Sequence, residues 1–359
     1  MGDFAYGHEP VMAARVTDLL VPALTAPQST SRAPASPASP APAVMVDATL
    51  GRAGHARRLL QACPGLTLIG IDADEAAIAA GQELAAEFPG RVRLAHAFYD
   101  QIAAIVADAG YRRVHGVLFD LGVSSPQLDD AERGFSYSRD APLDMRMDQS
   151  GGQTAADIVN FYTAADLARV LFEYGEERFA RRIANSIVRE RARTPVTTTL
   201  RLAGIVRDAI PAAARRTGGN PAKRAFQALR IEVNDELGVL RRALPDALDL
   251  LAPGGRLVVL AYHSLEDRLV KRGLTARTAD TLPPGLPVRA GDVLAGPAPG
   301  DAGVAGITVG PQFRLLTRGA ERPADDELAS NPRAASARLR AAERIREAAP
   351  QTDSRERTS

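Results

Sequence analysis

Short apolar runs alternate with helical patterns along the first third of the chain, and this alternation restricts the fold more than any other feature. The apolar runs predict four buried strands, at residues 44–46, 66–71, 92–95 and 116–119. The intervening segments predict helices at 54–62, 74–87 and 102–109. Strands that alternate with helices form parallel sheets covered on both faces. The pattern therefore predicts an α/β fold with a Rossmann-like sheet.

The alternation stops after the fourth predicted strand. From residue 134 onwards the sequence contains helical patterns without convincing strands, at 155–162, 164–174, 177–193, 199–213 and 222–244. Strand character returns at 256–262, after a turn at 252–255. We expect one domain made of residues 1–133 and 235–349. An all-helical domain of residues 134–234 is then inserted between its fourth and fifth strands.

The remaining segments predict local structure only. Residues 11–24 predict an amphipathic helix, 312–317 an edge strand and 338–348 a short helix. Residues 25–42 are almost entirely Ala, Pro and Ser and predict a flexible insertion, because they have little to bury. A Pro- and Gly-rich stretch at 280–304 predicts a loop, and the polar tail 350–359 predicts disorder.

The composition excludes several classes of protein. Because Cys63 is the single cysteine, the chain can form neither an internal disulfide nor a cysteine-based zinc site. No run of about 20 apolar residues predicts a membrane span. Asp3, His8 and Glu9 stand where a signal peptide would need a basic start. We therefore expect a cytoplasmic protein without a membrane partner, and no spacing of His, Asp and Glu predicts a metal site.

A polar loop follows the fourth predicted strand. Asp120 ends this strand, and the loop continues as Leu-Gly-Val-Ser-Ser-Pro-Gln. Ligands of open α/β sheets bind at the carboxyl ends of the strands, which makes Asp120 a candidate site residue. Further along, Asp144 and Arg146 alternate with methionines. These two residues either act in the site or pair with each other.

The turn after the first predicted strand suits a nucleotide-like ligand. Gly51 and Gly54 stand three residues apart, so the backbone can approach a ligand closely where a helix begins. Asp72 follows the second predicted strand and is placed to accept hydrogen bonds from both hydroxyls of a ribose. The same pattern also fits a tight turn without a ligand, and both interpretations stay open.

Positive charge is concentrated in the expected helical domain, although the formal net charge of the whole chain is only +1. Between residues 169 and 242, Lys and Arg outnumber Asp and Glu two to one. Such an excess predicts either a surface that binds RNA phosphates or a solvated helix face. The candidate RNA-binding residues flank a Gly-Gly-Asn-Pro turn and are Arg215, Arg216, Lys223 and Arg224.

Six blocks of sequence, in order along nearly the whole chain, point to one family. They are HEPVM at 8–12, DATLG at 47–51, DLGVSSPQLD at 120–129, YGEERFA at 174–180, FQALRIEVN at 226–234 and HSLEDR at 263–268. With these blocks the chain resembles the bacterial small-subunit ribosomal RNA methyltransferase H family, also called MraW. The resemblance implies a class I methyltransferase fold that uses S-adenosyl-L-methionine. It also implies methyl transfer to N4 of a cytosine in the decoding region of 16S rRNA, within the small ribosomal subunit.

The same resemblance implies a cofactor site. Its residues are Ala53, Gly54, His55, Asp72, Phe98, Asp120 and Gln127. Ala53, Gly54 and His55 would contact the methionine end, Asp72 the ribose and Phe98 the adenine, unless Phe98 only packs in the core. The family usually has glycine where this chain has Ala53. Alanine adopts a positive φ only at a cost, so we expect weaker cofactor binding if the turn requires that geometry.

Methylation of a cytosine amine needs a group that accepts its proton. The amine is a weak nucleophile, and a proton acceptor polarises it as charge develops. Asp120 and the loop that contains Ser125 are candidates for this role. His263 follows the fifth predicted strand at the same sheet edge. It is either the base, a residue that orients the nucleotide, or a structural hydrogen-bonding residue. The candidate catalytic residues are therefore Asp120, His263 and Ser125.

Two other functions stay open. The chain could methylate a small molecule or a protein, or it could be a non-catalytic RNA-binding factor in ribosome assembly. The arginine-rich insertion favours RNA over the first alternative. The intact blocks around Asp72, Asp120 and His263 argue against the second. Whether the chain forms a homodimer is also left open.

Overall fold

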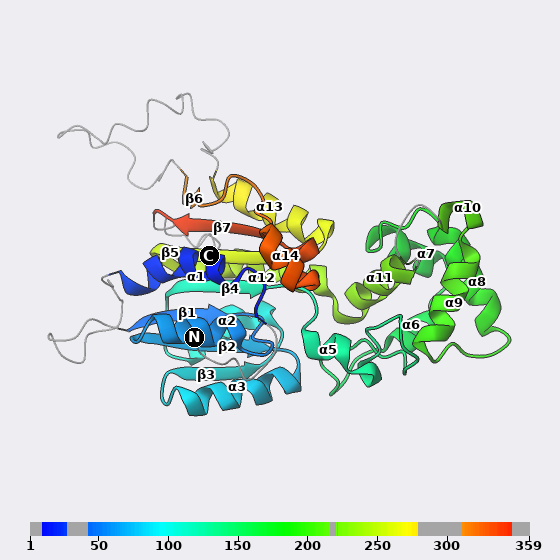
Figure 1. Cartoon of the computed structure of the whole chain (residues 1–359), viewed down its shortest axis with the longest axis horizontal. Helices are drawn as coiled ribbons and strands as arrows, with labels where there is room; N and C mark the ends of the chain where they lie inside the picture. Colours follow the sequence, from blue (N-terminus) through cyan, green and yellow to red (C-terminus); the bar gives the residue numbers. More distant parts are fainter. Residues whose placement is uncertain (1–8, 27–41, 216–219, 221, 279–310, 347–359) are drawn as a thin grey trace, which may run out of the picture.

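The computed structural model describes residues 9–26, 42–215, 220, 222–278 and 311–346. Figure 1 shows a sheet with helices around it and a group of helices beyond one end of the strands. Within the described residues the sheet has seven strands in the order β3-β2-β1-β4-β5-β7-β6. These strands are β1 Ala43–Asp47, β2 Leu66–Asp72, β3 Val92–His96, β4 Val114–Asp120, β5 Leu251–Ala261, β6 Phe313–Leu315 and β7 Arg338–Arg344.

The first five strands run parallel, which confirms the predicted α/β sheet. Strand order reverses between the neighbours β1 and β4, since β2 lies beside one and β5 beside the other. In folds of this class a crevice opens at the carboxyl ends of two such strands. The edge strand predicted at 312–317 is confirmed as β6.

Helices cover both faces of the sheet (Figure 1). One face carries α1 Ala13–Thr25, α2 Gly54–Ala62 and α3 Glu75–Glu87, and the other carries α4 Ile102–Asp108, α12 Glu236–Leu250 and α13 Ser264–Thr278. Successive side chains of a strand face opposite sides. Leu118 therefore packs in the first apolar layer and Phe119 in the second, and both are fully buried.

The turn that we predicted at 252–255 lies inside β5 instead. The register between β4 and β5 jumps at this point, because Val114 pairs with Leu251 while Gly116 pairs with Arg256. Gly254 has a φ of 80°, a conformation that favours glycine. The extra residues therefore form a bulge within one long strand.

The helix predicted at 338–348 is wrong for the described part of this segment. Arg338–Arg344 form β7, which is antiparallel to both β5 and β6. The letters RLRAAER favour a helix locally, but pairing with the distant β5 overrides this preference. The guanidinium of Arg344 is fully buried and donates hydrogen bonds to the carbonyls of Leu248 and Leu251. The pairing with β5 and the hydrogen bonds of Arg344 are long-range contacts, which a local sequence pattern does not reveal.

The group of helices beyond the sheet has an apolar core of its own, which includes Ile158, Leu167, Ile183 and Phe226. Its helices are α6 Ala155–Phe161, α7 Ala164–Glu173, α8 Ala180–Arg191, α9 Thr199–Ala209, α10 Ala212–Arg215 and α11 Ala222–Asn234. We call residues 134–234 the helical group. This separate core explains why each of these helices has an apolar face of its own.

Two of the predicted helices are each divided in two. The helix predicted at 199–213 is interrupted at Ile210, which is extended because it precedes Pro211. The helix predicted at 222–244 is interrupted at Asp235, whose φ is 46°. This second break separates α11 from α12, and so lies where the chain passes from the helical group to the sheet.

Short elements complete the described chain. They are α5 Ser125–Asp129, α14 Asp325–Ser330 and 3₁₀ helices at Tyr99–Gln101, Ala131–Arg133 and Pro332–Ser336. Most of the segment 25–42, the loop 280–304 and the tail 350–359 lie outside the described residues. No helix within the described ranges is long and apolar enough to cross a membrane.

Candidate active site

A cleft of about 880 Å³ lies at the carboxyl ends of the parallel strands. Ligand-binding clefts of about 300–1,000 Å³ are typical. Its lining brings together Asp47 from β1, Asp72 from β2, Asp120 from β4 and His263 from the residues after β5. Side chains of α11 line the cleft as well. The strand ends and the helical group therefore share one cavity.

The turn after β1 holds Ala53 in a left-handed backbone conformation. Its φ is 59°, which costs an alanine roughly 1–2 kcal/mol. Its amide donates a 2.8 Å hydrogen bond to the carbonyl of Leu50, and its side chain is fully buried. Gly54 and His55 line the cleft, whereas Ala53 is not part of the lining. Ala53 therefore shapes the turn from inside.

Gly54 lets the segment before α1 pack closely against this turn. A Cβ atom on Gly54 would lie 2.5 Å from Cγ of Pro10. Pro10 belongs to the HEPVM block and itself lines the cleft. The first of the sequence blocks therefore forms part of the cavity wall.

Asp72 links the turn after β1 to the residues after β2 through the two oxygens of its carboxylate. Oδ2 accepts a 2.8 Å hydrogen bond from the amide of Gly51, and Oδ1 accepts a 2.9 Å hydrogen bond from the amide of Asp74. Burial raises the pKa of Asp72, and these hydrogen bonds partly offset the rise. A carboxylate has about four acceptor positions. Asp72 can therefore fix the turn and still accept hydrogen bonds from a ligand.

Asp120 is held in place from two sides. The hydroxyl of Tyr262 donates a 2.7 Å hydrogen bond to Oδ1 of Asp120. The amide of Asp120 donates a 2.6 Å hydrogen bond to the hydroxyl of Thr49, which joins the end of β4 to the turn after β1. Burial raises the pKa of Asp120 to about 6, although the bond from Tyr262 opposes the rise. Such a carboxyl is mostly ionised at pH 7 and can still take up a proton.

His55 faces Asp120 from the first turn of α2. Its Nε2 lies 3.6 Å from Oδ2 of Asp120, which is too long for a hydrogen bond. Both ring nitrogens are buried and make no hydrogen bond to any residue in the described part of the chain. Burial lowers the pKa of His55 to about 4, and the charge of Arg58 adds to this. A neutral imidazole with unsatisfied nitrogens in a cavity wall is a position that a ligand can complete.

His263 belongs to a second polar cluster in the cleft, which we call the Arg230 cluster and which consists of Arg230, Glu236, His263 and Glu266. Nε and Nη2 of Arg230 donate to the two carboxylate oxygens of Glu236 at 2.7 and 2.9 Å. Oε2 of Glu266 accepts hydrogen bonds from the amides of Tyr262 and His263 at 2.8 and 3.2 Å. Oε1 of Glu266 lies 3.2 Å from Nε2 of His263, outside hydrogen-bond geometry.

Three members of the Arg230 cluster also approach one another at distances that a metal ion could bridge. Possible ligand atoms of Glu236, His263 and Glu266 lie within 4.8 Å of one another. However, Arg230 already occupies both oxygens of Glu236, and backbone amides occupy Oε2 of Glu266. The carboxylates therefore have donors without a cation, and we interpret the cluster as a hydrogen-bonding network.

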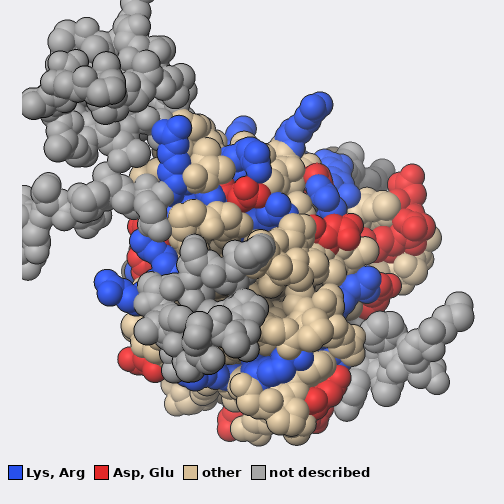
Figure 2. All heavy atoms as spheres, turned by 90° about the vertical axis from the view of Figure 1, so that its left-hand side faces the viewer, with Lys and Arg blue, Asp and Glu red and all other residues tan. Residues whose placement is uncertain are grey.

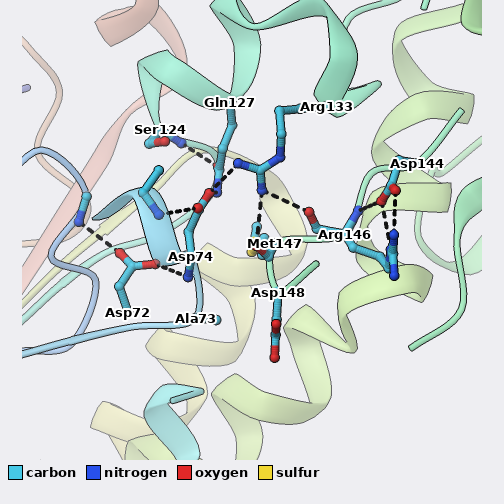
Figure 3. A network of polar contacts seen from close by, with 12 residues as sticks. Asp72, Ala73, Asp74, Ser124, Gln127, Arg133, Asp144, Arg146, Met147 and Asp148 are labelled. Carbon is cyan, nitrogen blue, oxygen red and sulfur yellow. Dashed lines mark hydrogen bonds and ion pairs between the residues drawn. The ribbon is translucent and has the colours of Figure 1, made fainter. Parts of the chain in front are cut away.

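A buried arginine ties the loop after β4 to the end of β2 (Figure 3). Nη1 of Arg133 donates a 2.8 Å hydrogen bond to Oδ2 of Asp74, and Nη2 donates to the carbonyls of Arg146 and Met147, both at 3.0 Å. Nε2 of Gln127 donates a 2.7 Å hydrogen bond to the same oxygen of Asp74. Asp74 thus connects the strand that carries Asp72 to two separate parts of this loop.

Asp144 and Arg146 pair with each other beside this network (Figure 3). Nη2 of Arg146 lies 2.7 Å from Oδ2 of Asp144, and Nε lies 2.9 Å from Oδ1. Burial opposes ionisation, but the bonds from Arg146 hold the pKa of Asp144 below its usual value. Neither residue is part of the cleft lining. Of the two interpretations of this pair, the structure supports mutual pairing.

The other residues expected in the cofactor and catalytic sites differ in how they are placed. Phe98 follows β3, is partly exposed and lines the cleft. Gln127 also lines it, but both ends of its amide are used, because Oε1 accepts a 2.9 Å hydrogen bond from the amide of Ser124. Ser125 is the first residue of α5, and its side chain lies outside what the structure describes.

The candidate RNA-binding residues are only partly described. Lys223 and Arg224 are exposed in the first turn of α11, and Lys223 also lines the cleft. Arg215 ends α10 without a described side chain, and Arg216 lies outside the described residues. Figure 2 shows the end of the molecule away from the helical group, where Lys and Arg side chains are interspersed with Asp and Glu.

Several residues of the cleft were not singled out from the sequence. Tyr262 stands directly before His263, and the bond that it makes to Asp120 crosses from β5 to β4. Arg230 and Glu266 stand inside sequence blocks whose individual members had no assigned role. Their position in those blocks was the one available signal. Nothing local distinguishes Glu236 from a surface charge, and the same holds for Arg133, which lies outside the cleft lining.

Comparison with known proteins gives the family. The model of the MraW methylase family matches residues 5–345. The protein named "Ribosomal RNA small subunit methyltransferase H" from Thermobifida fusca is 57% identical over 346 residues, which cover 96% of either chain. The protein of that name from Frankia alni is 58% identical over 94% of this chain and 95% of its own. The one from Saccharopolyspora erythraea is 55% identical over 95% and 94%. This chain therefore belongs to the MraW methylase family.

Proposed function

We propose that this chain transfers the methyl group of S-adenosyl-L-methionine to the exocyclic N4 of a cytosine in the decoding region of small-subunit rRNA. The observation that carries the proposal is the cleft in which Asp72 and Asp120 flank the end of β1. Small-subunit rRNA as the substrate is supported by relatives that span nearly the whole chain and carry that substrate in their name.

The residues of the cleft suit this cofactor. Asp72 keeps acceptor positions for the ribose hydroxyls, and Phe98, which lines the cleft, would contact the adenine. The buried, unsatisfied nitrogens of His55 and the backbone of Gly54 stand where the methionine end would lie. Ala53 and Gln127 contribute through the shape of the two loops that they hold, since their own polar groups are already bonded.

Asp120 is the group that we assign to the proton of the cytosine amine. Bound S-adenosyl-L-methionine supplies an electrophilic methyl group on a positively charged sulfur. Asp120 would accept the proton that the amine nitrogen loses when the methyl group passes from sulfur to nitrogen. The bond from Tyr262 keeps the carboxylate in one orientation for this purpose. We assign His263 to holding the target nucleotide, and Ser125 to the loop that follows Asp120 at the same edge of the sheet.

We further propose a division of labour between two domains. Residues 1–133 and 235–349 would form the methyltransferase domain, and residues 134–234 would recognise the substrate. The separate apolar core of the helical group supports this division. Lys223 and Arg224, together with Arg215 and Arg216, would contact phosphates of 16S rRNA within the small subunit, in the cytoplasm.

Nucleoside mass spectrometry of small-subunit rRNA tests the proposal. Cells that lack the protein should lose one N4-methylated cytosine, and the gene should restore it. Persistence of the modified nucleoside without the protein would reject the proposed reaction. Calorimetry with S-adenosyl-L-methionine distinguishes the enzyme from a non-catalytic assembly factor, because such a factor has no need to bind the cofactor.

A further inference from the structure

We infer that the Arg230 cluster is the subsite that reads the Watson–Crick edge of the target base, an inference that rests on the proposed function. The cluster lines the same cleft as Asp120. The side chains of Arg230, Glu236 and His263 are only 14%, 8% and 9% exposed. A base edge that reached them would be withdrawn from water, where hydrogen bonds and charges discriminate most strongly.

Glu266 supplies the acceptor of this subsite. Although burial alone would raise its pKa, contacts with His263 and Arg230 hold the pKa of Glu266 below its usual value. Its carboxylate therefore stays charged. Oε2 is taken by backbone amides, whereas Oε1 faces Nε2 of His263 at 3.2 Å without hydrogen-bond geometry and can accept a hydrogen bond from a ligand. The charge of Glu266 also raises the pKa of Asp120, so both carboxylates act on one region of the cleft.

His263 and Arg230 supply donors next to this acceptor. Nδ1 of His263 accepts a 3.4 Å hydrogen bond from the amide of Glu266, which places the ring proton on Nε2. Nε2 is buried and makes no hydrogen bond within the described ranges. Arg230 uses Nε and Nη2 on Glu236, which leaves Nη1 for a ligand.

This arrangement of one anionic acceptor beside two donors matches cytosine and opposes uracil. The pairing edge of cytosine has a donor at N4 and acceptors at N3 and O2, and a carboxylate is a known partner of the N4 amine. Uracil would present an oxygen to the charge of Glu266 and an N–H group to the donors. The subsite therefore selects the base that has an amine, and it holds that amine near Asp120.

A binding experiment with two bases tests the subsite. Reconstituted small subunits carry either cytosine or uracil at the target position, and their dissociation constants are measured with enzyme saturated with S-adenosylhomocysteine. Wild-type protein should prefer cytosine by roughly tenfold or more. Arg230→Lys and Glu266→Gln should each reduce this preference to less than about threefold. Arg256→Lys is the matched control, because Arg256 pairs with Glu343 at 2.9 Å in a partly buried site outside the cleft.

An unchanged preference for cytosine in both cluster variants would overturn the subsite. A second arm needs no variant and so does not depend on how the variants fold. Wild-type protein should bind targets that carry pyrimidin-2-one or 3-deazacytosine more weakly, since these lack the amine or N3. Equal affinity for cytosine, pyrimidin-2-one and 3-deazacytosine would also overturn the inference. Formation of N4-methylcytosine by the wild type is scored separately, because its absence would reject the proposed function itself.

Discussion

Nη1 of Arg133 lies 2.8 Å from Oδ2 of Asp74, and this buried ion pair joins the loop after β4 to the end of β2. Asp74 caps the first turn of α3, two residues after Asp72, through a hydrogen bond from the amide of Ala76. Arg133 also binds the carbonyl of Met147, whose amide donates to Oδ1 of Asn234 at the end of α11. A continuous chain of hydrogen bonds therefore runs from the end of β2 to the helical group.

Removing this arginine should destabilise the fold. Arg133→Met leaves Asp74 buried without its charged partner, and breaking a buried ion pair typically costs about 3–5 kcal/mol. We expect a clear drop in the midpoint of urea unfolding. Arg139→Met is the control, because the side chain of Arg139 is exposed and, among the described residues, makes a single long hydrogen bond of 3.3 Å. It should change stability by less than about 0.5 kcal/mol. Equal effects of the two substitutions would contradict the structural role of Arg133.

Asp72 should determine the affinity for S-adenosyl-L-methionine. Asp72→Ala removes the acceptor assigned to the ribose. It also breaks the hydrogen bond from the amide of Gly51 that fixes the turn in the wild type. We expect affinity to fall by about 1–3 kcal/mol, or roughly 5- to 150-fold, in calorimetry. Asp208→Ala, at an exposed carboxylate that pairs with Arg207, should leave the dissociation constant unchanged. Tight binding by Asp72→Ala would remove this residue from the site.

Much of the sheet could be predicted from the sequence because its signals are local. The strands that end at Asp72 and Asp120 are apolar runs followed by polar turns, and such runs identify themselves without their partners. β7 could not be predicted in this way. Its pairing with β5 and the burial of Arg344 depend on residues distant in sequence, whereas its composition favours a helix.

The residues of the candidate site differ in the same way, because some have a local signal in the sequence and others have none. Residues that directly follow strands, such as Asp72, Asp120 and His263, were found because strand ends of a parallel sheet meet at one edge. The partners that set their properties were missed. Tyr262 binds Asp120 across two strands, and Arg230 reaches the cleft from the helical group. A pKa or an orientation depends on such contacts, and spacing along the chain does not show them.

The strained turn at Ala53 should tolerate glycine better than valine. Ala53→Gly relieves roughly 1–2 kcal/mol of backbone strain. It loses about 0.8 kcal/mol of apolar burial and roughly 0.5–1 kcal/mol of chain entropy. We therefore expect unfolding free energy to stay within about 1 kcal/mol and cofactor affinity to be retained. Ala53→Val should lose both, because a β-branched side chain at this φ is strongly disfavoured and the site is fully buried. A valine variant with normal stability would show that the turn relaxes easily.

Two exposed cations of α11 should contribute to RNA binding through phosphates. Replacing both Lys223 and Arg224 with Ala should weaken binding to the small subunit and reduce the slope of log K against log salt by up to about two units. Cofactor affinity should not change. Arg93 and Arg112, exposed at the opposite end of the parallel strands, provide a control with the same loss of charge. Identical salt slopes for the two double variants would place the RNA elsewhere.

Asp120→Asn should make the protein more stable at neutral pH and nearly inactive. The folded-state pKa of Asp120 is about 6, above the value of 3.8 expected when unfolded. The folded state therefore binds more protons between these values, and its stability falls by on the order of 3 kcal/mol as pH rises through about 4 to 6. Asparagine avoids this loss and still accepts the hydrogen bond from Tyr262, so the melting temperature at pH 8 should equal or exceed that of the wild type.

Without a proton acceptor, turnover at saturating S-adenosyl-L-methionine should fall by about 10²- to 10⁴-fold. Wild-type turnover should instead rise with pH through about 6, as the carboxylate ionises. Substantial turnover by Asp120→Asn, with the pH profile of the wild type, would assign the amine proton to another group.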